Sequence, residues 1–356
     1  METKEIYNNK DNIHIFLKIQ NPKSNKNAYY SISKENKILI LINPDLKNEK
    51  NEQFFFDKIF TDNNENSYIY EEIVKNSVKE SIDKNNFTFI CYGNLNNESK
   101  DFIVGKNDCY SNINNRGIFL RFLENLNTKI SKNKNLNENL SLNISFLMTH
   151  ENKFIDLSNF IGMDYQKISN DLLKKYLIEY KKDNNYIIKK IPYENEKDVI
   201  YFLNKLFDKF ENLEIEGKKF LNNSHFSFII YINDNNGKII STINFIILGS
   251  NNIRNEKYKN ELNKIKKDIN LYINNKENKK ESTLFSLLQK ILLNIKDIHH
   301  KIIGTINPEL NSFSEIKEII DFISKCKKLK SKDIKIRFSD NKKINYIFIY
   351  FLTFFS

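Results

Sequence analysis

Residues 54–105 constrain the fold of this 356-residue chain more than any other stretch. They include a short apolar run at 87–91 without polar alternation, which indicates a strand buried on both faces. The run ends in Tyr92 and Gly93 and is followed by a polar turn that leads into a helix-like segment. A buried strand, a turn and a helix in this order predict the interior of an α/β sheet.

Apolar periodicity predicts further strands and helices in alternation along the chain. The expected strands are 14–19, 37–42, 142–148, 226–232, 238–247 and 301–306, and the sequence NDNNG predicts a hairpin between the fourth and the fifth. The expected helices are 69–82, 165–181, 197–213, 284–295 and 316–326. Ser312 and Glu315 have capping-box spacing before the last helix. The pattern predicts one α/β domain, a mostly parallel or mixed sheet with helices on both faces.

The composition permits a large core and a basic surface. Hydrophobic residues make up 40% of the chain and the formal net charge is +11. This charge suits an acidic partner, but lysine-rich drift on a solvated surface explains it equally well. Three distant cysteines, and five histidines without ligand-spaced neighbours, predict a reducing compartment and no metal site.

The two ends of the chain carry no recognisable targeting or membrane-spanning segment. The first ten residues are polar and lack the apolar core of a signal peptide. The apolar run at 344–356 is too short to span a bilayer, which takes about 20 residues. We therefore expect a cytoplasmic protein without a transmembrane segment, and the run is open to interpretation as a buried strand or an interfacial anchor.

The turn after Gly93 stands where a P-loop protein binds phosphate. The P-loop pattern is Gly, four residues, then Gly-Lys-Ser/Thr, in which glycine N–H groups, the Lys charge and a Mg²⁺-binding hydroxyl act together. Here Gly93 is followed by Asn96, Asn97 and Glu98. The frame of a phosphate site is present, but the residues that supply its chemistry are replaced.

The order of several motifs resembles the motor domain of kinesins. The segments that carry the resemblance are FFFDKIF (54–60), NNFTFICYG (85–93), RGIFLRFLENL (116–126), NNSHFSF (222–228), FIILGSN (245–251), STLFSLLQ (282–289) and 304–330. The fourth and fifth are similar to the family's switch I and switch II. The resemblance implies a P-loop NTPase-like kinesin motor fold over 11–331, between a polar tail at 1–10 and an extension at 332–356.

Carried over position by position, the resemblance gives a degenerate P-loop. Asn96 and Glu98 stand at family glycines, Ser99 at the Lys and Lys100 at the Mg²⁺-binding Thr. A shift by one residue would restore the Lys with Lys100 but would place Asp101 at the hydroxyl. Either alignment brings a carboxylate into a loop that must attract polyphosphate.

The switch positions show the same loss. Asn223 stands at the switch I Arg, Ile246 at the switch II Asp and Asn251 at the switch II Glu. The nucleotide-binding positions implied by the resemblance are Lys18, Pro22, Tyr92, Gly93, Asn94, Asn96, Glu98, Ser99, Lys100, Asn223, Ser224, Ile246, Gly249 and Asn251. We expect no catalytic residue, no metal and no cofactor, with Mg·ATP as the ligand if the site still functions.

The resemblance also implies a tubulin-facing segment at 252–282. Its basic residues suit an acidic tubulin surface, while interleaved acids suit an ordinary solvated helix. The basic residues are Arg254, Lys257, Lys259, Lys264, Lys266, Lys267, Lys276, Lys279 and Lys280.

The sequence therefore predicts a kinesin-like microtubule-binding protein of the cytoskeleton, non-catalytic, acting as a pseudo-motor or scaffold. The expected partners are tubulin and either a catalytic kinesin partner or a cargo protein. One alternative is a divergent ATP-driven motor. The other is an unrelated basic α/β domain that binds nucleic acid, which we do not expect because basic residues and aromatics are not interleaved at one clear site.

Overall fold

The computed structural model covers the whole chain, and some segments of it are described here. These are 13–19, 30–42, 51–61, 65–93, 98–106, 108–109, 111–133, 139–150, 153–164, 168–179, 181, 186–194, 196–211, 214–215, 218–219, 224–249, 256–273, 281–291, 298–308 and 312–340. The predicted tail at 1–10 and the apolar run at 344–356 lie outside the described residues.

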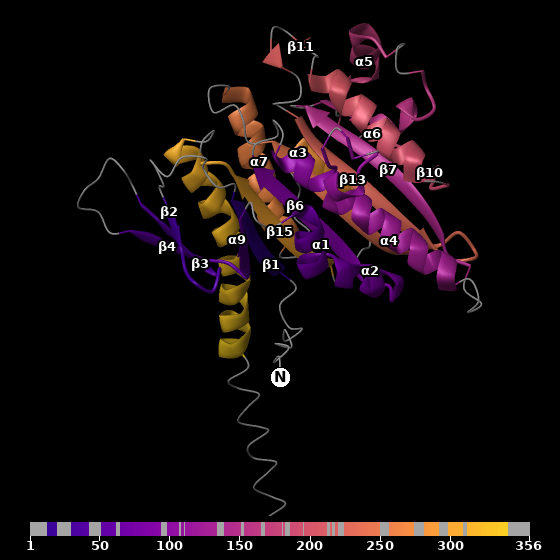
Figure 1. Cartoon of the computed structure of the whole chain (residues 1–356). Helices are drawn as coiled ribbons and strands as arrows, with labels where there is room; N and C mark the ends of the chain where they lie inside the picture. Colours follow the sequence, from indigo (N-terminus) through magenta and orange to yellow (C-terminus); the bar gives the residue numbers. More distant parts are fainter. Residues whose placement is uncertain are drawn as a thin grey trace, which may run out of the picture.

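A ten-stranded mixed sheet forms the centre of the domain (Figure 1). The strand order is β5-β1-β15-β6-β14-β13-β7-β8-β9, with β10 paired to β7. The parallel strands are β5 (Lys58–Phe60), β1 (Ile13–Ile19), β15 (Ile298–Ile306), β6 (Asn86–Gly93) and β14 (Ile239–Gly249). The antiparallel continuation is β13 (Ser224–Asn233), β7 (Ser141–His150), β8 (Lys153–Asp156), β9 (Ile178–Glu179) and β10 (Ile191–Pro192).

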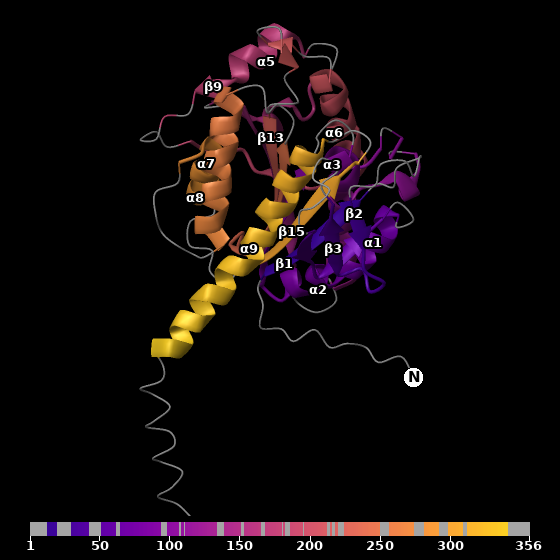
Figure 2. The same ribbon diagram turned by 90° about the vertical axis from the view of Figure 1, so that its left-hand side faces the viewer.

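Helices cover both faces of this sheet, and Figure 2 shows the two layers from the side. The first layer contains α1 (Asn66–Ile73), α2 (Lys75–Ile82), α3 (Glu98–Ile103), α4 (Ile118–Asn133) and α6 (Glu196–Glu211). The second contains α7 (Glu256–Ile273), α8 (Thr283–Ile291) and α9 (Phe313–Asp340). The α/β architecture predicted from the alternation is confirmed.

The cores of the two layers differ in composition. In the first, Phe89 stacks on Phe245 with ring centroids 4.6 Å apart, and Phe119 and Phe122 pack edge-on against Phe245. In the second, branched aliphatic side chains of α7, α8 and α9 predominate. Here α9 approaches β15 closely because Gly304 has no side chain, and a Cβ there would overlap the Ile323 side chain of α9.

Smaller elements surround the sheet. A three-stranded antiparallel sheet of β2 (Tyr30–Ile32), β3 (Ile38–Leu41) and β4 (Glu52–Phe55) lies beside α9 (Figure 1), where Lys317 pairs with Glu52. The remaining elements are α5 (Asn170–Tyr176), the hairpin of β11 (Glu214–Ile215) and β12 (Lys218–Lys219), and the 3-10 turns η2 (Ile113–Asn115) and η4 (Leu157–Phe160). None of the helices in the described segments is long and apolar enough to cross a membrane.

Most elements expected from the sequence are present, and three helices differ, of which α9 runs from Phe313 to Asp340 and is longer than the predicted 316–326. The predicted hairpin is formed by β13 and β14, and the capping box is made, with Ser312 N donating to Glu315 Oε2 at 2.8 Å. The helix predicted at 165–181 is wrong in length, because the chain forms only α5 and then turns into β9, which pairs with β8.

The predicted helix 69–82 is divided at Val74 into α1 and α2. Lys301 of β15 explains the division, since its Nζ donates to the Ile73 carbonyl at 2.5 Å and to Ser77 Oγ at 2.7 Å. A carbonyl at the end of α1 thereby gains a donor from the sheet. Burial lowers the pKa of Lys301 to about 8.

Candidate functional site

The carboxyl ends of four neighbouring parallel strands meet at one edge of the sheet. Gly93 of β6 is aligned with Gly249 of β14 on one side and Thr305 of β15 on the other, and Thr305 is aligned with Lys18 of β1. After β6 the chain crosses to the first helical layer, whereas after β14 it enters the second. Open α/β sheets bind ligands at such a switch point, so this edge is the candidate site.

Lys18 is engaged with two neighbouring elements at this edge. Its Nζ donates to Asn66 Oδ1 of α1 at 3.0 Å and lies 5.1 Å from the ring centroid of Phe102 of α3. Asn66 in turn donates from Nδ2 to the backbone carbonyl of Asp101 at 3.0 Å. Lys18, a predicted nucleotide-binding position, therefore joins β1, α1 and α3. The other predicted position on this segment, Pro22, lies outside the described residues.

The helix after β6 is short, and its described cation is buried. The six residues of α3 make about one and a half turns, so few peptide dipoles align toward its N-terminus. Lys100 is 2% exposed, and its Nζ lies 5.8 Å from the ring centroid of Phe207 on α6. Asn94 and Asn96 lie outside the described residues, and Glu98 and Ser99 begin α3 with side chains that are not described.

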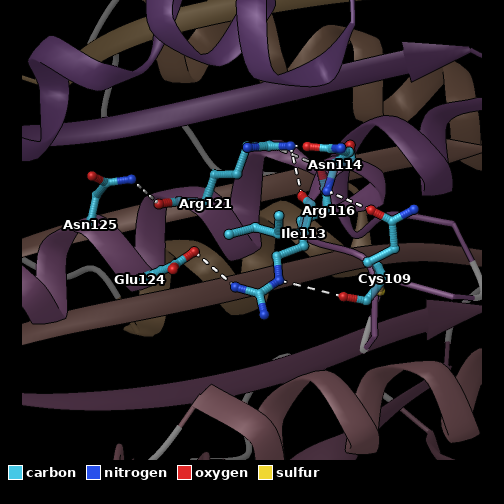
Figure 3. Close-up of polar contacts among 8 residues, drawn as sticks. Cys109, Ile113, Asn114, Arg116, Arg121, Glu124 and Asn125 are labelled. Carbon is cyan, nitrogen blue, oxygen red and sulfur yellow. Dashed lines mark hydrogen bonds and ion pairs between the residues drawn. The ribbon is translucent and has the colours of Figure 1, made fainter.

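The segment between α3 and α4 closes on itself (Figure 3). Its stem is the bridge between Gly105 and Arg116, where Gly105 has φ 128° and no room for a Cβ. The Arg116 guanidinium donates to Glu124 of α4 at 2.9 Å and to the Cys109 carbonyl at 3.4 Å. Arg121 of α4 donates to loop carbonyls, including that of residue 113 at 2.9 Å. Two arginines thus hold the loop against α4.

The ends of β13 and β14 are joined by a buried histidine. The Gly249 N–H donates to His225 Nδ1 at 3.2 Å, so the neutral ring carries its proton on Nε2. Burial is the main cause that lowers the pKa of His225 to about 3, and His150 adds to it. Ser224 Oγ is within hydrogen-bond distance of His150 Nδ1, at 3.2 Å. Asn223 and Asn251 lie outside the described residues.

Ile246 and Tyr92 belong to the core of the second layer. Ile246 is completely buried and is aligned with Ile90 of β6. Tyr92 packs edge-on against Phe322 of α9, with ring centroids 5.3 Å apart. A hydrocarbon at position 246 offers no oxygen to Mg²⁺, which prefers oxygen ligands.

Within the described part of this edge, the Ile246 side chain offers no ligand atom to Mg²⁺. In the described segments, no group of three His, Cys, Asp or Glu side chains could hold a metal ion.

Three of the predicted tubulin-binding lysines have described side chains, and all three are ion-paired within the chain. Lys264 pairs with Glu261 at 3.6 Å, Lys267 pairs with Glu281, and Lys266 pairs with Glu318 of α9. Lys264 and Lys267 are about half exposed, whereas Lys266 is only 16% exposed. Lys257 and Lys259 lie on α7 with side chains that are not described, and Arg254, Lys276, Lys279 and Lys280 lie outside the described residues.

Two carboxylates of α7, Asp268 and Glu261, support the N-terminus of α8. This role was not predicted from the sequence. Asp268, fully buried, accepts from the backbone N–H groups of Glu281 and Ser282 at 2.7–3.0 Å and from the Ser282 hydroxyl at 2.7 Å. Glu261 accepts from Thr283 N at 3.0 Å, and burial raises its pKa. Their spacing of seven residues on the apolar side of α7 is the signal that could have identified them.

The family profile described as the kinesin motor domain matches residues 15–329. Since this match spans most of the chain, it identifies the family and excludes the alternative of an unrelated nucleic-acid-binding domain. No curated protein sequence matches the chain.

Solved structures with the same fold are motor domains of low sequence identity. Drosophila NOD, in a structure docked with bovine tubulin into a map of its microtubule complex, has a TM-score of 0.66 and 14% identity, covering 89% of this chain and 97% of that one. The motor domain of Saccharomyces cerevisiae Kar3 has a TM-score of 0.65 and 18% identity, covering 89% of this chain and 100% of that one. The motor and motor homology domain of Kar3Vik1, fused to a synthetic heterodimeric coiled coil, has a TM-score of 0.66 and 19% identity. The match covers 88% of this chain and 85% of that one.

Proposed function

Because the chain belongs to the kinesin motor domain family, we propose that it is a microtubule-binding protein of the cytoskeleton that does not hydrolyse ATP. It acts as a pseudo-motor or scaffold, in which the motor frame supplies a binding surface. The observation that carries this proposal is Ile246, a buried hydrocarbon at the position where the family has the switch II Asp.

Three functions of a phosphoryl-transfer site are compromised together. Such a site needs a phosphate cradle, a Mg²⁺ ligand and a positioned water. The P-loop has Glu98 in place of a glycine, Ile246 replaces the Asp, and Asn223 and Asn251 replace the Arg–Glu pair of the switches. When catalytic groups act as a unit, the removal of one of them removes most of the rate. The replacement of several therefore supports the proposal that this site does not hydrolyse ATP.

Microtubule binding is supported by the charge of α7 and by its position after switch II. Lys264 and Lys267 keep about half of their side-chain surface exposed although each has an acidic neighbour. The Lys267–Glu281 pair is exposed and therefore weak, and about half of the Lys264 side chain is exposed although its partner Glu261 is buried, so both lysines remain available to an acidic surface. NOD, with the same fold, has been fitted with tubulin in a microtubule complex.

The chain also suits pairing with a catalytic kinesin or a cargo protein. A chain that binds the microtubule without hydrolysing ATP produces movement only when a partner supplies the energy. The Kar3Vik1 structure, which joins a motor and a motor homology domain through a heterodimeric coiled coil, has the same fold as this chain.

Co-sedimentation with microtubules tests the binding proposal. We expect the purified chain to pellet with microtubules at low salt, and the bound fraction to fall as salt shortens the Debye length from about 30 Å at 0.01 M to about 8 Å at 0.15 M. The bound fraction should be the same with and without Mg·ATP. Failure to pellet at any salt concentration would contradict microtubule binding, and Mg·ATP-dependent release would favour the divergent motor.

A further inference from the structure

Lys266 of α7 lies where three elements meet in the second layer. Its ammonium group is ion-paired with Glu318 of α9. It also lies 5.1 Å from the ring centroid of Tyr92, one residue before the end of β6, and 5.7 Å from that of Phe322 on α9. One cation therefore contacts both the central strand and the last helix.

The surroundings of this cation are closely packed. Tyr92 and Phe322 meet edge-on, and the Lys266 ammonium lies near both rings. Ile265 and Ile269 of α7 are fully buried in the same cluster, so the helix is seated on the sheet on both sides of Lys266. A cation–π contact strengthens as it is desolvated, and a partly buried ion pair is screened less than an exposed one.

Neighbouring lysines of α7 make contacts of a different kind. Lys264 pairs with Glu261 on its own helix, and Lys267 pairs with Glu281 just before α8. Both pairs stay within the α7–α8 unit. Among the α7 lysines whose side chains are described, only Lys266 contacts β6 and α9.

We propose that Lys266 interlocks α7 with α9 and with the carboxyl end of β6, so that the three elements move as one body. The interlock joins the candidate ligand edge to the helix that carries the exposed basic residues. While it is closed, α7 keeps one orientation on the sheet whatever occupies the edge. That this orientation is the one presented to microtubules rests on the proposed function, whereas the interlock itself does not.

Hydrogen exchange of the full chain, without microtubules or nucleotide, tests the interlock. Lys266→Met keeps the length and packing of the side chain and removes its charge, and Lys264→Met on the same helix is the matched control. We expect amides of α7 and of α9 around 316–323 to exchange roughly tenfold faster in the first variant, and the control to match the wild type.

Glu318→Gln removes the charge of the partner without placing a new group in the core, because Glu318 is 40% exposed. We expect Glu318→Gln to speed amide hydrogen exchange in α7 and α9. This test does not depend on whether the Lys266 variant folds. Wild-type exchange in Glu318→Gln would overturn the interlock.

A second arm adds Mg·ATP to the wild-type chain in the same measurement. If α7 is interlocked, the hydrogen-exchange protection of its amides should be the same with and without Mg·ATP. A change in this protection would contradict the proposal that α7 keeps one orientation on the sheet. Because no microtubules are present, failure here is distinguishable from a failure to co-sediment, which would contradict the proposed function alone.

Discussion

The carboxyl edge of the parallel strands and the layer of α7, α8 and α9 use charged residues differently. At the edge, the alignment with the family assigns Asn223, Ile246 and Asn251 to charged positions, and the described cations Lys18 and Lys100 contact aromatic rings. In the layer, Asp268 and Lys266 bind partners on neighbouring elements. The described cations of the edge thus lie against aromatic rings, whereas the second layer uses a buried carboxylate and an ion pair to join neighbouring elements.

This difference indicates which part of a motor frame can be lost without loss of the fold. Phosphate chemistry depends on a few side chains at strand ends, and the sheet forms with Ile246 at the position that the alignment assigns to the switch II Asp. The seating of α7 and α8 depends on buried acids whose removal leaves donors unsatisfied. We therefore expect substitutions at the edge to change ATPase activity little, and substitutions in the second layer to lower the free energy of unfolding strongly. Edge positions that lie in the core are the exception, because their substitution also lowers the free energy of unfolding.

Replacing Ile246 by Asp should produce the largest effect and tests whether this edge position is core or ligand site. An uncompensated carboxylate among buried aliphatic side chains should lower the free energy of unfolding by about 4 kcal/mol. Ile246→Val, the matched control, should lower it by about 1 kcal/mol. Urea unfolding measures both. A stable Asp variant that Mg·ATP stabilises further would place position 246 at a working site and break the comparison.

Replacing Asp268 by Asn should produce the next largest effect and tests the layer. The amide nitrogen would face donors that now have a carboxylate, so we expect a loss of about 2–3 kcal/mol in the free energy of unfolding. Asn263→Ala, an exposed change on the same helix, should be nearly neutral. Equal stability of the two variants would show that α8 does not depend on its buried carboxylate.

The pH dependence of stability tests the histidine that joins β13 to β14. The pKa of His225 is lowered from 6.5 to about 3 in the fold, so the unfolded chain binds the extra proton between these values. Stability should therefore fall on acidification through this window, by about 1.6 kcal/mol from pH 6.5 to pH 5 for this group alone. Urea unfolding of His225→Gln should lack this component. The same pH slope in both proteins would contradict the neutral buried ring.

Replacing Lys264 and Lys267 together by Gln should have the smallest effect on stability, because the Lys267–Glu281 pair is exposed and about half of the Lys264 side chain is in solvent. If these lysines face tubulin, the double variant should pellet with microtubules several-fold less well at low salt. The matched control is Lys205→Gln with Lys209→Gln, two exposed lysines of α6 on the other face. Equal pelleting of the two double variants would remove α7 from the microtubule interface.

Local signals in the sequence sufficed for much of the fold. The turn sequence NDNNG and the apolar strands beside it predicted the β13–β14 hairpin, and Ser312 with Glu315 predicted the start of α9, because both depend on neighbouring residues. The division at Val74 could not be predicted, since it depends on Lys301 from a strand more than 200 residues away in the chain. The interleaved charges of α7 hide a narrow apolar stripe, so the sequence alone indicates only a charged segment there.

The candidate site was predictable as a location but not as a set of contacts. The strand ending in Tyr92 and Gly93 indicated the ligand edge, and the order of the motifs indicated the family. The spacing of the lysines on α7 could not distinguish Lys266 from Lys264 and Lys267. The contacts that distinguish Lys266, those with Glu318 and Tyr92, come from distant segments of the chain. The resemblance treated all three as surface cations, whereas the fold places Lys266 against the core.

Phosphate release from Mg·ATP, with and without saturating microtubules, tests the central claim most directly. We expect no release above that of a protein-free control under either condition, because the proposed alignment puts Ile246 at the switch II Asp and asparagines at the Arg–Glu pair of the switches. The contradictory result is microtubule-stimulated release at a rate typical of a motor that disappears when Ser99 and Lys100 are replaced by Ala.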